Sequence, residues 1–467
     1  MTTDTDTEVR STVDPDLPGL VAGLRATHAA GRTRSVEWRL GQLRALARLL
    51  EECEDEIAGA LAADLDRNRF DAWFGDIAST MGEVTYAIKN LRRWMRPKRV
   101  GLPLAQQPGR ARVQYEPLGV VLVIGPWNYP VFLTLGPLVA ALAAGNCVVL
   151  KPSELAPATS ALLARIVPAY LDAGAVKVVE GGGDTTQDLL AIGFDHALFT
   201  GGTEIGRKIM AGAAATLTPV TLELGGKSPA VVAADADLGI AARRIAWVKM
   251  MNSGQTCISP DYVLVDATVR DAFIGELTTA IGNQSREAQH GLKIINERQF
   301  SRLAGYLEET KGRIALGGGV DRETLRIEPT VLVDPDPDEP AMTDEIFGPI
   351  LPVVSFDDVD GVVSFVNGRP KPLGLYVFSR SSAIAERLVD AIPAGGAVVN
   401  HVALHCLVPN LPFGGVGASG MGAYHGEWGF QTLSHRKAVL LKTLRPDLRI
   451  VYPPYGKKAR KLMRMLF

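Results

Sequence analysis

The chain has 467 residues, which is too long for one ordinary hydrophobic core, so we expect two or three domains. Its composition, 47% apolar and 21% charged residues, is typical of a soluble globular protein, and its net charge of −2 gives no reason to expect a nucleic acid as partner. No stretch approaches the roughly 20 apolar residues that a membrane span needs.

The N-terminal segment and the cysteines favour a cytoplasmic location. Thr2–Glu8 is polar and acidic and lacks the apolar stretch of a signal peptide, so we expect a frayed tail. Cysteines at 53, 147, 257 and 406 show no CxxC pair and no metal-ligand spacing, so we expect neither disulfides nor a metal site.

The first hundred residues have a helical pattern. Apolar residues recur mostly three or four apart over residues 36–66, which predicts one amphipathic helix. The same spacing runs from Ile77 to Met95, where Pro97 ends a second helix. Arg99–Pro117 is punctuated by Pro and Gly, and we interpret it as an excursion in the form of a hairpin.

From residue 119 short apolar runs alternate with helical or Gly/Pro-punctuated stretches. This alternation predicts a parallel sheet with helices on both faces. The runs are 120–124, 147–150, 176–179, 197–200 and 220–224. The helix Leu133–Ala144 ends at Gly145-Asn146, which is a predicted C-cap.

A second α/β unit is predicted from about residue 226. The expected helices are 238–251, 267–281 and 297–311, and the expected strands lie near 262–264, 353–356, 375–378 and 397–400. Asp334–Pro340 is predicted to be a surface loop, and the Gly-rich stretch Pro412–Gly417 is too irregular for either element.

Two segments together indicate covalent chemistry. Val220–Leu224 alternates as a strand does and stops at Gly225-Gly226, which leaves Glu223 near the end of the strand. Cys257, in the segment Gly254–Ile258, follows a helical run and the flexible residues Asn252–Thr256. A thiol nucleophile and a carboxylate base that the fold can bring together suit acyl transfer.

A glycine-rich turn is a candidate phosphate site. The chain lacks the GxGxxG pattern of ordinary dinucleotide folds and has Phe199-Thr-Gly-Gly-Thr-Glu-Ile-Gly206 after a predicted strand. Its glycines would admit a pyrophosphate, and Thr203 could cap the following helix, although a plain strand-to-helix turn is equally compatible with this pattern. Lys151 and Glu154, at the end of another strand, could hold ribose hydroxyls.

Several signatures, in a fixed order, resemble the aldehyde dehydrogenase superfamily. They are Glu116-Pro-Leu-Gly, Gly125-Pro-Trp-Asn-Tyr-Pro130, Leu150-Lys-Pro-Ser-Glu154, Leu222-Glu-Leu-Gly-Gly-Lys227, Gly254-Gln-Thr-Cys257, Glu345-Ile-Phe-Gly-Pro349 and Leu411-Pro-Phe-Gly-Gly-Val-Gly417. Asn252–Cys257 and Ser419–Gly426 are most similar to class 3, the branch of fatty and aromatic aldehyde dehydrogenases.

The resemblance implies an α/β fold with a Rossmann-type cofactor domain, an α/β catalytic domain and a small bridging element. We expect residues 1–98 and 119–225 to form the NAD(P)-binding domain and residues 226–399 the catalytic domain. Residues 99–118 and 400–467 are expected to bridge the subunits of a homodimer.

The same resemblance assigns roles to residues. Cys257 is the expected nucleophile, Glu223 the general base, and Asn128 the amide that holds the oxyanion together with the Cys257 backbone N–H. The expected contacts of the cofactor are Trp127, Lys151, Glu154, Gly201, Gly202, Thr203, Gly206, Leu224, Gly225, Glu345 and Phe347. The other three cysteines, and His401, His405 and His425, are expected to be structural.

The implied reaction is the NAD(P)-dependent oxidation of a medium-chain, long-chain or aromatic aldehyde to the acid, through a thiohemiacetal and a thioester on Cys257. A CoA-acylating enzyme is one alternative, although it would not need Glu223 to activate water. A non-catalytic binding protein is another, although it should have lost one of the three catalytic residues. NAD and NADP both stay open, because Lys151 suits a 2′-phosphate and Glu154 would repel it.

The C-terminal segment contains both basic and apolar residues. Residues 457–467 contain five cations interleaved with apolar side chains, and the run is too short to span a bilayer. A solvated basic tail is one interpretation. The other is a segment that docks near the substrate mouth or makes a peripheral contact with an anionic membrane.

Overall fold

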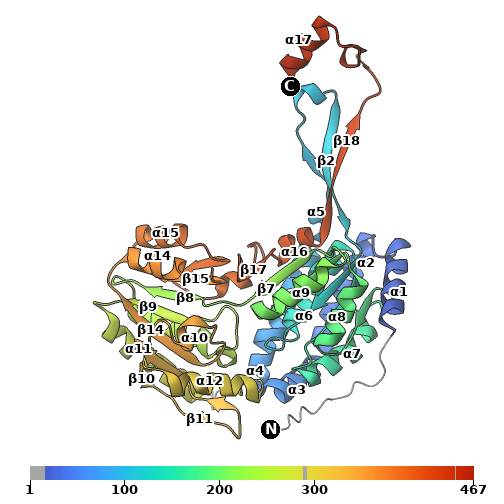
Figure 1. Cartoon of the computed structure of the whole chain (residues 1–467). Helices are drawn as coiled ribbons and strands as arrows, with labels where there is room; N and C mark the ends of the chain where they lie inside the picture. The colour runs from blue at the N-terminus through green and yellow to red at the C-terminus, as the bar shows by residue number, and fades with distance from the viewer. Residues whose placement is uncertain (1–15, 288–291, 448, 467) are drawn as a thin grey trace.

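The computed structural model describes residues 16–287, 292–447 and 449–466. It contains two α/β bodies side by side and a long β-ribbon that projects away from them (Figure 1). The N-terminal tail expected over Thr2–Glu8 and the final Phe467 lie outside the described residues. None of the described helices combines the length and the apolar composition that crossing a bilayer requires.

The first body is built on a six-stranded sheet with the order β17-β7-β6-β3-β4-β5. Its strands are β3 (Val120–Ile124), β4 (Cys147–Lys151), β5 (Val176–Val178), β6 (His196–Gly201), β7 (Val220–Leu224) and β17 (Gly420–Met421). All are parallel except β17, which runs antiparallel to β7 at the edge. The five strands predicted from apolar runs are therefore confirmed to within one residue at either end.

Helices cover both faces of this sheet, as the alternation predicted. Val121 and Val123 of β3 point into a core shared with the helices that follow residue 36, while Val120 and Leu122 point into a core shared with the first helix of the chain. The helices are α1 (Leu17–Ala29), α2 (Val36–Glu52), α3 (Glu54–Leu65), α4 (Arg69–Ala72), α5 (Ser79–Trp94), α6 (Phe132–Ala144), α7 (Pro157–Tyr170), α8 (Gly183–Ile192) and α9 (Thr203–Ala214).

Two details differ from expectation. The single helix expected over 36–66 is wrong, because the backbone of Cys53 leaves the helical region (φ −103°, ψ 16°) and separates α2 from α3. The apolar spacing continues across the break and so conceals it. The second helix begins with a π-helical turn, η1 (Trp73–Ala78), ahead of α5. The predicted C-cap is confirmed, since Gly145 ends α6 at φ +87°.

The second body contains a seven-stranded sheet with the order β10-β13-β14-β9-β8-β15-β16, in which only β10 is antiparallel. The strands are β8 (Pro229–Val232), β9 (Tyr262–Asp266), β10 (Arg313–Leu316), β13 (Thr330–Val333), β14 (Ile350–Phe356), β15 (Gly374–Phe378) and β16 (Gly396–Val399). Helices α10 (Leu238–Met250) and α11 (Arg270–Glu287) cover one face, and α14 (Val359–Asn367) and α15 (Ser382–Ala391) cover the other.

The remaining elements of this body are shorter. They are α12 (Glu297–Glu309), α13 (Pro340–Thr343), β11 (Val320–Asp321), β12 (Arg326–Ile327), and the 3₁₀ turns η3 (Met251–Gly254) and η4 (Leu404–Leu407).

The ribbon consists of β1 (Lys98–Val100), β2 (Gly109–Pro117) and β18 (Ser434–Lys442), all antiparallel, with the 3₁₀ turn η2 (Leu104–Gln106) between β1 and β2. The expected hairpin is confirmed. At its far end the chain forms η5 (Arg449–Val451) and α17 (Lys457–Leu466), well away from both bodies (Figure 1). At its near end α16 (Gly426–Thr432) packs on α5 and α6.

Candidate active site

Residues selected from the sequence gather where strands of the first sheet end. β3 runs into Gly125–Asn128, β4 ends at Lys151, β6 at Gly201 and β7 at Leu224. The strand order reverses between β3 and β6, since the chain passes to β4 and β5 on one side and returns to β6 and β7 on the other. Open α/β sheets bind their ligands in the crevice at such a switch point.

The turn between β6 and α9 fits a phosphate group. A Cβ added to Gly202 would meet no atom within 4 Å, and no side chain of the described residues caps the first turn of α9. The first N–H groups of this twelve-residue helix are therefore available to an anion. The expectation that Thr203 caps the helix is wrong. Gly202 takes the cap position, so Thr203 is the first helical residue and donates its hydroxyl to the Ala418 carbonyl over 3.2 Å.

Gly206 has a packing role. A Cβ at this position would lie 2.6 Å from Leu224 Cδ2, so its absence lets α9 approach the end of β7. Contact of Gly206 or Leu224 with the cofactor stays a prediction.

Lys151 and Glu154 form an ion pair at the end of β4. Lys151 is 2% exposed, and its Nζ donates to Glu154 Oε2 over 3.0 Å and to the Pro152 carbonyl over 3.1 Å. The Glu154 side chain is half-exposed. Ribose hydroxyls can donate to such a carboxylate and accept from such an ammonium group, so the pair fits the sugar of a dinucleotide.

A second loop brings Glu345 to the end of β7. A Cβ added to Gly225 would lie 2.0 Å from Glu345 Oε2, so only glycine admits this carboxyl group. Burial, and then the charge of Asp261, raises the pKa of Glu345 to about 8. Phe347 has a left-handed backbone (φ +49°), and its ring stands edge-on to Trp127 with centroids 5.4 Å apart. Backbone strain of this kind in a non-glycine residue is often found at functional sites.

Cys257 follows an unusual backbone turn. Asn252, Ser253 and Gly254 all have positive φ, at 52°, 50° and 71°. Reciprocal side-chain bonds stabilise this turn, because Asn252 Nδ2 donates to the Gln255 carbonyl over 3.0 Å and Gln255 Nε2 donates to the Asn252 carbonyl over 3.1 Å. The turn fixes where the chain enters the Cys257 segment.

Cys257 lines an apolar cavity of about 770 Å³, a volume that includes its open mouth. The aromatic side chains in its wall are Phe74, Tyr129, Phe132, Trp247, Phe413 and Tyr424. Cys406 and His425 also line it, so the interpretation of these two residues as purely structural is incomplete. His425 Nδ1 is bonded to Glu83 Oε1 over 2.7 Å.

Burial raises the pKa of both the Cys257 thiol and the Glu223 carboxyl group. After burial, interactions with Glu345, Cys406 and Glu223 raise the pKa of the thiol further. Glu223 is 3% exposed, and neither of its carboxyl oxygens has a hydrogen-bond partner among the described residues. In both cases the buried environment disfavours the charged form of the group.

Asn128 is tied to the Cys257 segment. It is 4% exposed, and its Nδ2 donates to the Gln255 carbonyl over 3.1 Å. A carboxamide carries two N–H donors, so one remains for another acceptor. A hydrogen bond of 3.0 Å between the hydroxyl groups of Tyr129 and Thr256 joins the same two segments. The structure thus places the Asn128 amide against the segment that carries Cys257.

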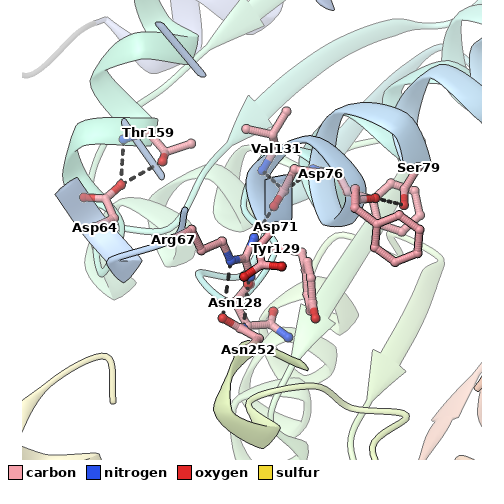
Figure 2. A network of polar contacts seen from close by, with 12 residues as sticks. Asp64, Arg67, Asp71, Asp76, Ser79, Asn128, Tyr129, Val131, Thr159 and Asn252 are labelled. Carbon is pink, nitrogen blue, oxygen red and sulfur yellow. Dashed lines mark hydrogen bonds and ion pairs between the residues drawn. The ribbon is translucent and has the colours of Figure 1, made fainter. Parts of the chain in front are cut away.

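Two buried residues of this site were not found from the sequence. Arg67 and Asp76 form an ion pair, with side chains 1% and 0% exposed, beside Asn128 and Asn252 (Figure 2). Arg67 lies in a polar loop and Asp76 in a helical turn, and neither belongs to a motif that could have indicated the role.

Comparisons with known proteins agree with these observations. A family model described as "Aldehyde dehydrogenase family" matches residues 15–439. Aldehyde dehydrogenase family 3 member A2 of Mus musculus is 46% identical, over 93% of this chain and 90% of its own length. "Aldehyde dehydrogenase, dimeric NADP-preferring" of Rattus norvegicus is 45% identical, over 90% of this chain and 93% of its own. The solved structure of Staphylococcus aureus AldH, in a substrate-bound state, superposes with a TM-score of 0.92 at 36% identity and covers 98% of this chain and 100% of its own.

Proposed function

The chain belongs to the aldehyde dehydrogenase family, and from this premise we propose that it oxidises an apolar aldehyde while the substrate is bound covalently to Cys257. As a member of this family it is an enzyme that acts on the aldehyde group with NAD or NADP. The observation that carries the proposal is the position of Cys257 on the wall of an apolar cavity, with the Asn128 amide tied to the same segment.

Cys257 supplies the nucleophile. Its Sγ bonds to the aldehyde carbon and forms a thiohemiacetal, and the thiol proton must go to a base because the thiolate is the attacking species. The aldehyde oxygen becomes an oxyanion. The Asn128 N–H that Gln255 does not occupy, together with the Cys257 backbone N–H, supplies donors to it.

The second half of the reaction belongs to Glu223. Departure of hydride from the thiohemiacetal carbon leaves a thioester on Cys257. Glu223 takes a proton from a water molecule that attacks the thioester carbonyl. Cleavage of the C–S bond releases the carboxylic acid, and the sulfur leaves as a thiolate that regains the proton from Glu223. Neither of its oxygens has a hydrogen-bond partner in the described part of the chain, so either can accept that proton in the ionised form.

The crevice at the strand ends fits NAD or NADP through the open turn at Gly202 and the exposed N–H groups of α9. Lys151 and Glu154 would hold one ribose, and Glu345 and Phe347 the nicotinamide ribose. A bound nicotinamide cofactor supplies the acceptor for the hydride.

The substrate class follows from the cavity wall. Phe132, Trp247 and Phe413 favour a medium-chain, long-chain or aromatic aldehyde over a polar one, because transfer of apolar surface from water into such a cavity is favourable by about 25 cal/mol per Å².

We also propose the division of labour and the assembly. Residues 1–98 and 119–225 bind the cofactor, 226–399 carry the nucleophile, and 99–118 with 400–467 bridge the subunits of a homodimer. Support comes from apolar side chains that are exposed on the projecting ribbon and just after it. They are Val100 (51% exposed), Leu440 (49%), Leu441 (50%) and Leu444 (94%). Exposed apolar side chains on a projecting element favour an intersubunit contact. The rat relative is named as dimeric.

The protein is proposed to be cytoplasmic, with peripheral contact between α17 and anionic membranes. The five cations of α17 are exposed and Met465 is 75% exposed, while Ala459 is buried. The alternative that the tail docks at the substrate mouth of its own chain does not fit the geometry, because the ribbon carries α17 away from both bodies (Figure 1).

The direct test is NADH or NADPH formation when the protein is mixed with a medium-chain aldehyde and each oxidised cofactor, with identification of the product. A free acid as product supports the proposal, and an acyl-CoA formed only when CoA is added would indicate the acylating alternative.

Cys257→Ser should abolish this activity and leave cofactor binding unchanged, because a serine hydroxyl is barely ionised at neutral pH. Turnover of this variant within about tenfold of the wild type, a barrier change of only ~1.4 kcal/mol, would exclude Cys257 as the nucleophile.

A further inference from the structure

Arg67 places a buried positive charge directly behind the amide proposed to hold the oxyanion. It lies in the loop between α3 and α4 and is 3% exposed. Its guanidinium donates to Asp76 Oδ2, to the Asn128 carbonyl, and over 3.3 Å to Asn252 Oδ1 (Figure 2). It also stacks on Tyr129, with its central carbon 4.3 Å from the ring centroid. The planar, rigid fork of donors is what allows one side chain to fix three acceptors.

Asp76 holds the other end of the same turn. Its Oδ1 accepts hydrogen bonds of 2.9 Å from the backbone N–H groups of Val131 and Phe132, where α6 begins. Asp76 itself lies in the π-helical turn η1, and such turns are frequent at functional sites. Arg67 and Asp76 therefore hold the chain at two points, the Asn128 carbonyl and the start of the following helix.

The Asn128 carbonyl also accepts from Asn252 Nδ2 over 3.0 Å, and Asn252 belongs to the strained turn before Cys257. Arg67 thus contacts both segments whose relative position decides where the free Asn128 N–H lies with respect to Cys257. If Arg67 were removed, the Asn128 carbonyl would keep only the hydrogen bond from Asn252 among those of the described residues, and Asn252 Oδ1 would lose the hydrogen bond from Arg67.

We propose that Arg67 and Asp76 are positioning residues, which hold the Asn128 amide in the orientation that stabilises the oxyanion on Cys257. This inference rests on the proposed function, because it presumes an oxyanion at Cys257. It assigns no contact between Arg67 and the substrate.

The test is a double-mutant cycle on kcat. Asn128→Ala should lower kcat by about 100-fold, the usual effect of removing one oxyanion donor. Arg67→Met should lower kcat by about tenfold or more, because a misplacement of about 1 Å has effects of this size. If Arg67 acts through Asn128, the double variant is no slower than Asn128→Ala alone. Losses that multiply in the double variant would overturn the proposal.

Two further variants separate positioning from folding. Arg67→Lys keeps the charge beside Asp76 but lacks the fork, so it should recover part of the kcat that Arg67→Met loses. Arg67→Met combined with Asp76→Asn avoids an unpaired buried carboxylate, and it provides a folded protein for the cycle if Arg67→Met alone unfolds. A kcat equal to that of the wild type in the folded Arg67→Met, Asp76→Asn variant would also overturn the proposal.

Arg39→Met is the matched control. Arg39 is likewise a buried arginine, and it donates to the Ala143 carbonyl at the opposite end of α6 and to the Thr33 carbonyl. Its loss should lower the melting temperature and leave kcat within about twofold, so an equal fall in kcat would show that destabilisation alone explains the Arg67 result.

Alkylation of Cys257 by iodoacetamide supplies an independent readout, because this displacement forms no oxyanion. Its rate should be unchanged in Arg67→Met while kcat falls; a parallel fall in both would contradict the proposal by showing that Cys257 itself has moved. Absence of any dehydrogenase activity in the wild type would contradict the proposed function, which keeps the two failures distinct.

Discussion

Glu223 is a carboxyl group that the fold buries without a partner. Both of its oxygens are unpaired within the described residues, and burial raises its pKa well above the ordinary value of a glutamate. Only the deprotonated form can take a proton from water. Since the pKa is raised, the fraction in the active form increases with pH across a range that lies above the usual titration of carboxylates.

Glu223→Gln should therefore slow hydrolysis of the thioester more than its formation. A carboxamide cannot accept the proton of water, so steady-state turnover should fall by about 100-fold or more and an acyl adduct should accumulate on Cys257. Rapid mixing followed by intact-mass measurement detects the adduct. The rate of thioester hydrolysis by the wild type should rise with pH through the pKa of Glu223. The hydrolysis rate of Glu223→Gln should lack this rise with pH. Wild-type turnover without an adduct would show that Glu223 is structural.

At the residue scale, the site residues that lie in contiguous motifs could be predicted from the sequence. The site residues that lie outside such motifs could not. Cys257, Glu223 and Asn128 each belong to a short signature, so they were selected without knowledge of the fold. Arg67 contacts Asn128 and Asn252, which are 61 and 185 positions away. Nothing in the loop around Arg67 indicates these partners, because a buried polar contact of this kind exists only after the fold has formed.

At the scale of elements, the strands that carry the site are those with the simplest pattern. β3 is a continuous apolar run, which is what a parallel strand covered on both faces requires, and β7 alternates apolar residues with Thr221 and Glu223. β18 was missed because most of its nine residues are exposed and it has no buried face to produce an alternation. Its strand conformation comes from pairing with β2 along its whole length.

The turn before Cys257 depends on glycine at position 254. Its φ of +71° is unfavourable for other residues, and a Cβ there would lie 2.1 Å from the Gly348 carbonyl oxygen, a backbone atom that cannot rotate away. This contact joins the Cys257 segment to the loop that carries Glu345 and Phe347.

Gly254→Ala should therefore destabilise the protein by about 2 kcal/mol or more and lower kcat, because both loops must shift. Thermal unfolding and steady-state kinetics measure the two effects. Gly275→Ala is the matched control, since Gly275 is exposed on α11 with no atom within 4 Å of an added Cβ. It should stabilise the helix by up to about 1 kcal/mol. Equal behaviour of the two variants would show that the turn does not need glycine.

At the scale of the whole molecule, the two α/β units and the hairpin were predictable, and their relative placement was not. The spacing of apolar residues indicates which face of a helix or strand packs against its own sheet, and it carries no information on how two distant units are placed. The position of α17 at the end of the ribbon depends instead on the pairing of β2 with β18, whose partners Glu116 and His435 are far apart in sequence. Of the interpretations left open for the tail, docking at the chain's own substrate mouth does not fit this placement, whereas a solvated tail and a contact with an anionic membrane both do.

Placed at that distance from both bodies, α17 has the composition of an electrostatic membrane contact. Its cations are Lys457, Lys458, Arg460, Lys461 and Arg464, all exposed. Each basic residue near an anionic leaflet contributes roughly 1 kcal/mol, so several together give reversible binding that salt weakens. A solvated tail with no partner would show no such dependence on lipid charge.

Deletion of residues 457–467 should thus reduce sedimentation with phosphatidylserine-containing vesicles, and replacement of the five cations by Gln should have the same effect. Phosphatidylcholine vesicles are the control, to which neither the wild type nor the variants should bind strongly. In the deletion variant, the KM for a long-chain aldehyde presented in anionic vesicles should rise. Its KM for a short, soluble aldehyde should stay the same, which would show that the active site is intact. If sedimentation with anionic vesicles is unchanged by the deletion, the membrane contact is refuted. If sedimentation falls but the KM for the long-chain aldehyde does not change, α17 binds lipid without serving substrate delivery.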